Sequence, residues 1–84
     1  MLFTVEYVDS LVTVDAENID YWGGGCGYAD EFAHCERALY RQLMNAAKQA
    51  VGLNGVRGRA QYYGDVIEFR PFRTAAVMLV YPAT

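Results

Sequence analysis

The sequence predicts an α+β domain with the element order ββαβββ, in which one helix packs on a mainly antiparallel sheet of about five strands. Short segments near both ends alternate apolar and polar residues, whereas one long central stretch carries apolar residues at spacings of three and four. Two-residue turns separate neighbouring strand segments, which favours antiparallel hairpins. Because the chain has 84 residues, we expect residues 1–84 to form a single domain with one small core.

Residues 2–8 and 11–15 are expected to form the first hairpin, because both segments alternate in hydropathy. Asp9 and Ser10 lie between them and are residues that favour turns. The core face of the first strand is predicted to carry Phe3, Val5 and Tyr7. The next stretch, 16–28, has no periodicity and holds four of the eight glycines, so we expect a long loop there.

A helix is predicted over residues 29–51. Asp30 and Glu31 lie in its first turn and Lys48 near its end, as the helix dipole favours, and Gly52 follows as a stop. The expected core stripe consists of Phe32, Cys35, Leu39, Leu43, Ala46 and Ala50, with Tyr40, Met44, Ala47 and Val51 beside it.

Residues 57–63 and 66–70 predict a second hairpin with a two-residue turn. Pairing outward from this turn places Tyr63 opposite Val66, Tyr62 opposite Ile67, Gln61 opposite Glu68, Ala60 opposite Phe69 and Arg59 opposite Arg70. Like charges at Arg59 and Arg70 are unfavourable when directly opposed. We therefore expect either an acidic neighbour on an adjacent strand or a frayed end.

Residues 74–81 are apolar on both sides, which is typical of a central strand covered on both faces. Several apolar residues fall on the side opposite the predicted core and would form a self-association or partner surface: Leu2, Val8, Leu11, Tyr63, Val66, Met78 and Val80. The alternative is that the predicted faces are shifted by one residue.

Charge is distributed unevenly along the chain. Residues 1–36 hold eight acidic residues and no Lys or Arg, whereas residues 37–84 hold all seven cations and two acids. The two parts therefore carry formal charges of −8 and +5, within a total of −3. This asymmetry is either neutralised inside the fold or directs an acidic surface toward basic partners. A negative net charge argues against a domain whose sole function is to bind nucleic acid, because contacts of Lys and Arg with phosphates supply most of the affinity in such domains.

No motif points to an enzyme, a cofactor or a metal. The glycines at 23–27 lack the phosphate-binding pattern, and acidic residues follow them where phosphate would bind. Cys26, His34 and Cys35 are fewer than the four ligands of a structural zinc site. A disulfide between the two cysteines is conceivable, with two free thiols as the alternative. Cys26 could act as a nucleophile with His34 as its base, but the sequence shows no third residue that would orient His34.

The longest apolar run, residues 75–81, is far shorter than the roughly 20 residues of a membrane helix. The first residues, MLFTVEYV, include no cation, so the sequence does not predict a secretory signal. We expect a cytoplasmic protein without membrane contact.

The best candidate binding site is the aromatic loop. Tyr21, Trp22 and Tyr28 lie there together with the acidic residues Glu17 and Asp20. Tyr and Trp are enriched at binding hot spots, because they bury much surface at little entropic cost. The alternative for Trp22 is that it folds back and covers the core.

A second candidate site is a basic stripe on the polar side of the predicted helix. Arg37, Arg41 and Lys48 recur there at helical spacing, with Arg57 and Arg59 nearby in sequence. Such a stripe can follow a phosphate backbone while tyrosines stack on bases. The alternative is an ordinary solvated helix face.

Together these observations predict a non-enzymatic, small acidic domain that binds another protein through its N-terminal region and aromatic loop. In size, acidity and lack of a catalytic motif the chain is similar to small inhibitors encoded by phages and mobile elements, including anti-CRISPR and antirestriction proteins. The similarity is one of general character and covers no motif. It implies a partner with a basic, nucleic-acid-handling surface. A nucleic-acid-binding module and a structural homodimer stay open as alternatives.

Overall fold

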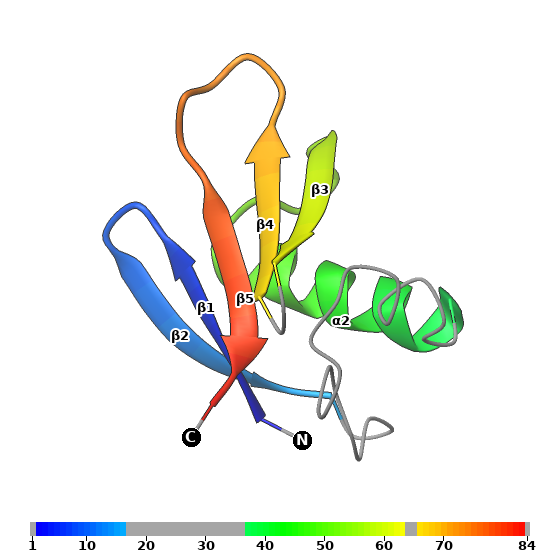
Figure 1. Ribbon diagram of the computed structural model, residues 1–84. Coiled ribbons are helices and arrows are strands. Elements are labelled where there is room, and N and C mark those ends of the chain that lie inside the picture. Colours follow the sequence, from blue (N-terminus) through cyan, green and yellow to red (C-terminus); the bar gives the residue numbers. More distant parts are fainter. Residues whose placement is uncertain (1, 17–36, 64–65, 84) are drawn as a thin grey trace.

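The computed structural model describes residues 2–16, 37–63 and 66–83. These residues form five strands and a helix in the predicted order (Figure 1). The elements are β1 (Leu2–Tyr7), β2 (Ser10–Asp15), α2 (Arg37–Ala50), β3 (Gly58–Tyr63), β4 (Val66–Pro71) and β5 (Met78–Pro82). The predicted α+β architecture is therefore confirmed.

The last strand lies in the middle of the sheet. The strand order is β2-β1-β5-β4-β3, and all neighbouring strands are antiparallel. β5 thus joins the two hairpins into one sheet, as a strand predicted to be central should. It begins at Met78 rather than at residue 74, because the preceding residues form the connection from β4. There the hydroxyl oxygen of Thr74 accepts a hydrogen bond of 3.2 Å from the amide of Ala76.

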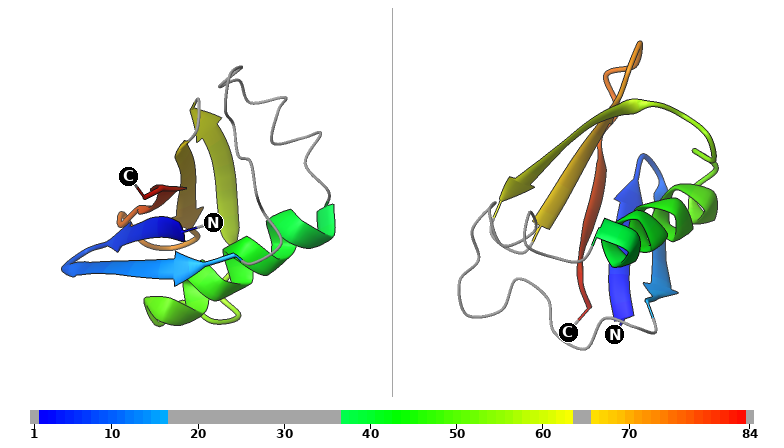
Figure 2. Two further views of the ribbon diagram at one scale, coloured as in Figure 1. Left: turned by 90° about the horizontal axis from the view of Figure 1, so that it is seen from below. Right: turned by 90° about the vertical axis from the view of Figure 1, so that its right-hand side faces the viewer.

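α2 crosses one face of the sheet, and the core lies between them (Figure 2). From the helix, Leu43, Met44 and Ala47 are buried. From the sheet, the buried apolar side chains are Phe3, Val5, Ile67, Phe69, Met78 and Val80. Each large side chain of this kind contributes about 1.5–3 kcal/mol when it leaves water, so this one layer supplies most of the apolar stabilisation.

Two of these positions correct the sequence prediction. Met78 and Val80 were expected on the face opposite the core, but both are fully buried beneath α2. The pairing requires this, because Val80 lies opposite Val5 of β1 and Ile67 of β4, both of which face the helix. β5 is apolar at successive positions, so its hydropathy pattern does not indicate which side faces the core.

The helix stripe is also corrected. Ala50 was expected in the core but is exposed, and Ala46 is only half-buried. The buried residues are Leu43, Met44 and Ala47, at spacings of one and three. The side of the helix that packs on the sheet is therefore rotated slightly from the predicted stripe. The predicted stripe residues at positions 32 and 35 lie outside the described residues.

Glycines end the helix and shape the segment that follows. Gly52 has a φ of 81°. The amide of Leu53 donates to the Lys48 carbonyl at 2.7 Å and that of Gly52 to the Gln49 carbonyl at 3.3 Å, a Schellman motif. The predicted stop at Gly52 is therefore confirmed. A second turn follows, in which Gly55 has a φ of 79°.

The first hairpin turns one residue earlier than predicted. Tyr7 pairs with Ser10, so the turn residues are Val8 and Asp9 rather than Asp9 and Ser10. Val8 has a φ of 53°. Sequence patterns point away from such a turn, because a β-branched residue is rarely found at positive φ.

The predicted register of the second hairpin is confirmed at all its pairs, from Tyr63 opposite Val66 to Arg59 opposite Arg70. The acidic neighbour expected near the two arginines is present but not on an adjacent strand. It is Glu68, two residues before Arg70 on β4 itself, and its Oε1 lies 2.6 Å from the Arg70 Nε.

β3 begins at a glycine because the next strand passes very close. A Cβ atom built on Gly58 would lie 2.3 Å from the Arg70 carbonyl oxygen and 2.7 Å from the Pro71 Cα. Both are backbone atoms, so no side-chain rotation can relieve the clash. The two strands can approach this closely only without a side chain at position 58.

We predict that Gly58→Ala lowers the free energy of unfolding by about 1–3 kcal/mol, the usual effect of forcing a methyl group into filled space. Urea unfolding monitored by circular dichroism measures the change. Asn54→Ala, at an exposed position in the same connection, serves as the control and should leave the midpoint nearly unchanged. An unaltered midpoint for Gly58→Ala would show that β3 and β4 can move apart at this position without a loss of stability.

Candidate functional site

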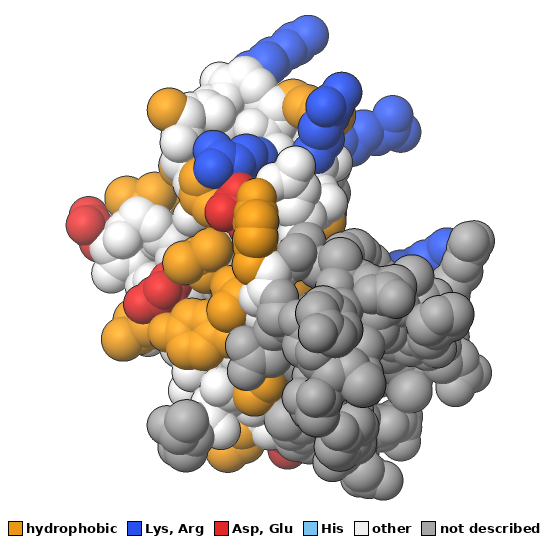
Figure 3. All heavy atoms as spheres, in the orientation of Figure 1, with side chains coloured by type: hydrophobic (Ala, Val, Ile, Leu, Met, Phe, Trp, Pro, Cys, Tyr) orange, Lys and Arg blue, Asp and Glu red, His pale blue; other side chains and the backbone are white. Residues whose placement is uncertain are grey.

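The sheet face opposite α2, here called the outer face, carries the candidate binding surfaces. Strand alternation and the pairing register place the following residues on it: Leu2, Thr4 and Glu6; Leu11, Thr13 and Asp15; Leu79 and Tyr81; Val66, Glu68 and Arg70; and Arg59, Gln61 and Tyr63. Figure 3 looks onto this face. Leu2, Leu11 and Tyr63 are at least half exposed, so the expectation of apolar residues on this face holds for them.

Charge is separated across the outer face. The first hairpin contributes Glu6, Asp9 and Asp15, whereas arginines lie on and beside β3 and β4. In Figure 3 the Lys and Arg side chains gather at the top, over β3, β4 and the connection to β5, with one acidic side chain beside them, and further acidic side chains lie at the left, over the first hairpin. The charge asymmetry of the sequence therefore reappears as an asymmetry in space.

The acidic side of the face contains a shallow groove of about 360 Å³, here called the hairpin groove. Its described lining residues are Glu6, Tyr7, Val8, Asp9, Ser10, Leu11, Val77 and Leu79. Val8 and Leu11 are 73% and 67% exposed, respectively. Apolar side chains at the tip of the hairpin are thus bordered by two carboxylates, those of Glu6 and Asp9.

Glu6 is held in place by a neighbour on β5. Tyr81 donates a hydrogen bond to the Glu6 carboxylate. Burial, followed by the negative charge of Glu6 and this hydrogen bond, raises the pKa of Tyr81 above its usual value of 10.0. The ionised form of the phenol is therefore disfavoured beside Glu6.

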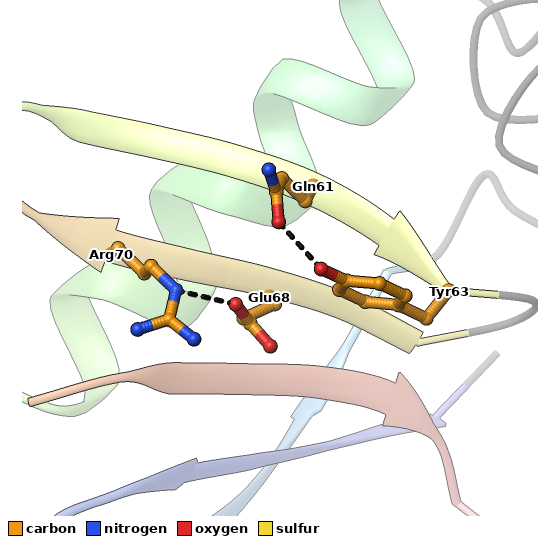
Figure 4. A network of polar contacts seen from close by, with 4 residues as sticks. All are labelled: Gln61, Tyr63, Glu68 and Arg70. Atoms are coloured by element: carbon orange, nitrogen blue, oxygen red, sulfur yellow. Dashed lines mark hydrogen bonds and ion pairs between the residues drawn. The ribbon is translucent and has the colours of Figure 1, made fainter.

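The opposite side of the face contains a second groove, of about 500 Å³, here called the arginine groove. Its described lining residues are Arg59, Gln61, Arg70, Pro71, Phe72 and Arg73. Figure 4 shows two side-chain contacts that order its wall. The Arg70 Nε donates to the Glu68 Oε1 at 2.6 Å, and the Tyr63 hydroxyl donates to the Gln61 Oε1 at 2.6 Å.

The aromatic loop predicted to bind a partner cannot be placed. Glu17, Asp20, Tyr21, Trp22 and Tyr28 lie outside the described residues, and so do Cys26, His34 and Cys35. These predictions therefore stay predictions.

The basic stripe is placed in part. Arg41 is exposed on α2, and the Arg37 side chain lies outside the described part of the structure. Lys48 is half-buried, and its Nζ lies 5.0 Å from the centre of the Phe69 ring. This cation–π contact gives Lys48 a role in packing the helix onto β4.

Sequence reasoning missed Phe72 and Arg73 as candidate site residues, and it named Val8 only as part of the apolar surface opposite the core. For Arg73 a signal was present, because the segment RPFRT places cations on both sides of an aromatic residue. Combined with the register that pairs Arg59 with Arg70, this signal was sufficient to predict a basic end of the second hairpin. For Val8 the sequence indicated an exposed apolar residue but not its place in the hairpin turn.

Within residues 2–16, 37–63 and 66–83, no three His, Cys, Asp or Glu side chains come together in a way that could hold a metal ion. Among the described helical residues, none form a helix long and apolar enough to cross a membrane.

Comparison of the chain with models of protein families, with curated proteins and with solved structures found no match. Function therefore has to be inferred from the surfaces of the molecule itself.

The hydrogen bond between Tyr81 and Glu6 predicts a measurable titration. The ultraviolet difference between the wild type and Tyr81→Phe during alkaline titration should show one phenol with a midpoint above 10, because its ionised form is disfavoured next to Glu6. In Glu6→Gln the same midpoint should fall. Since the pKa is raised in the folded state, the associated stabilisation is present below pH 10 and is lost as pH rises through the folded pKa. A Tyr81 midpoint at or below 10 would contradict this contact.

Proposed function

We propose that this protein is a non-enzymatic domain that binds another protein through the hairpin groove. One observation carries the proposal: Val8, at the tip of the first hairpin, is 73% exposed and has a φ of 53°. Glycine is preferred at the first turn position when its φ is positive, and a left-handed conformation costs other residues roughly 1–2 kcal/mol. A strained, exposed apolar side chain in that place has no role in the core, which suggests a role at the surface.

The surroundings of Val8 indicate the chemistry of the partner. Leu11 lies next to it on β2, and Leu79 and Val77 continue the apolar surface onto β5 and the segment before it. Glu6 and Asp9 border these side chains. An apolar centre with an acidic border is complementary to a protein surface with an apolar centre and a rim of Lys or Arg.

The proposal extends to the class of partner. The acidic residues of positions 1–36, with a formal charge of −8, favour binding to a basic, nucleic-acid-handling protein. The general similarity to small phage and mobile-element inhibitors supports an inhibitor of the anti-CRISPR or antirestriction type, acting in the cytoplasm. Glu17, Asp20, Tyr21, Trp22 and Tyr28 belong to the proposal as a second contact region, on the sequence grounds given above.

Strain at Val8 predicts a stability effect. Val8→Gly should raise the free energy of unfolding by about 1 kcal/mol, because the strain that it relieves exceeds the roughly 0.5–1 kcal/mol of chain entropy that glycine adds. Urea unfolding measures this change. Ser10→Gly, two positions later and without a positive φ, is the control and should be destabilising. A lower urea midpoint for Val8→Gly would show that Val8 is not strained in the wild type, and the proposal would lose the observation on which it depends.

The binding test starts from capture by the tagged full chain at low and at high salt, followed by calorimetry with the purified partner. Val8→Gly and Leu11→Ser should each weaken binding about tenfold or more, as expected when an apolar anchor is lost from an interface centre. Leu2→Ser is the matched control, because Leu2 is 51% exposed on the same face but does not line the hairpin groove. Equal affinity for the wild type and both groove variants would exclude this surface as the binding site.

A homodimer is a second candidate, favoured by the opposite charges on the two sides of the outer face. In a two-fold arrangement the acidic side of one copy would face the arginine side of the other. Sedimentation equilibrium distinguishes this candidate, because the mass would double with concentration and dimerisation would weaken with salt. A monomeric mass at the highest soluble concentration would exclude it.

A further inference from the structure

We propose that the arginine groove binds a single-stranded nucleic acid, with arginines on its phosphates and Phe72 stacked on a base. The site lies on the sheet, away from the helix stripe that sequence analysis favoured for nucleic acid. It is also separate from the hairpin groove, so it does not depend on the proposed protein partner.

Positive charge is concentrated in this groove. Among its described lining residues three are arginines and none is acidic. Arg57 lies beside them, since its carbonyl accepts a hydrogen bond of 3.0 Å from the Phe72 amide. Within the described parts of the chain, no carboxylate pairs with Arg59 or Arg73. The fold thus assembles four cations around one aromatic side chain and neutralises only Arg70.

The pairing of β3 and β4 brings two of these cations together, and Glu68 offsets the charge of only one of them. Arg59 and Arg70 are direct cross-strand partners on the same face, and like charges in that relation destabilise a sheet. Phosphate binding between them would convert the repulsion into two charge-assisted contacts. A bound phosphate would thus also neutralise the charge of Arg59, which Glu68 is not shown to contact.

Arg70 is oriented for such a ligand. Its Nε is used by Glu68, which fixes the plane of the guanidinium group (Figure 4). Its two terminal nitrogens take no part in that bond and remain as donors for phosphate oxygens. Arginine favours phosphate particularly because its planar donor fork matches two oxygens at once.

Aromatic side chains favour nucleic acid over an acidic peptide. Phe72 is 55% exposed in the β4–β5 connection, and its neighbour Arg73 has a φ of 69°, a second strained position. Tyr63 is also 55% exposed on the same face, four residues along β3 from Arg59, or about 13 Å at ~3.3 Å per residue. A strand of unpaired bases laid along β3 would meet a stacking ring at each end and cations near Phe72.

Fluorescence anisotropy with a labelled twelve-nucleotide oligothymidine, and with the matching oligouridine, tests the site on the full chain. Three or four phosphate contacts predict a loss of roughly 20- to 50-fold in affinity between 50 and 200 mM salt, at a slope of about 0.7 per contact. Arg59→Gln combined with Arg73→Gln should reduce the salt slope by about 1.4. Phe72→Ala should weaken binding about fivefold or more and leave the slope unchanged.

The controls separate this site from the alternatives. Arg41→Gln, an exposed cation on α2, should bind like the wild type, and Leu11→Ser should lose protein partner binding but keep oligonucleotide binding. Each variant is first checked by its urea midpoint, and all substituted groove residues are exposed. Three results would each overturn the proposal: no binding at 50 mM salt, loss of binding only in Arg41→Gln, or equal competition by a polyanion without bases together with no effect of Phe72→Ala.

Discussion

The insertion of β5 between two hairpins is the constraint on which the rest of the structure depends. Its hydrogen bonds join β1 on one side to β4 on the other, and its buried residues Met78 and Val80 lie beneath α2. A hairpin alone is at best marginally stable in water, and three or more strands with a covered apolar face are needed for a sheet to be stable on its own. The last segment of the chain therefore completes both the sheet and the core.

This topology also explains the distribution of charge. The acids of the first hairpin and the arginines of the second are far apart in sequence, and β5 holds the two hairpins on opposite sides of one sheet. This separation by a central apolar strand leaves an acidic groove beside the first hairpin and a basic groove beside the second, both on one face.

Sequence patterns were sufficient wherever local rules decide the structure. A two-residue turn sets the register of the second hairpin, and a glycine at positive φ ends α2, so both were predictable. Sequence patterns were insufficient to predict which face of β5 is buried. A strand that is apolar at successive positions shows no alternation, so its neighbours in the sheet determine which side faces the core. The turn at Val8 was missed because local propensity favours Asp9 and Ser10. The candidate grooves depend on the way distant segments meet, which a single sequence indicates only through charge.

Strain and repulsion occur together in this small fold. Val8 and Arg73 are the described non-glycine residues with positive φ, and each lies at the edge of one of the two grooves. The opposed arginines at 59 and 70 line the second groove as well. A domain of this size has few kcal/mol of net stability, so unfavourable features of roughly 1 kcal/mol each are a substantial fraction of it. Their position at exposed grooves, and not in the buried layer between α2 and the sheet, is the pattern expected when binding rather than folding determines those residues.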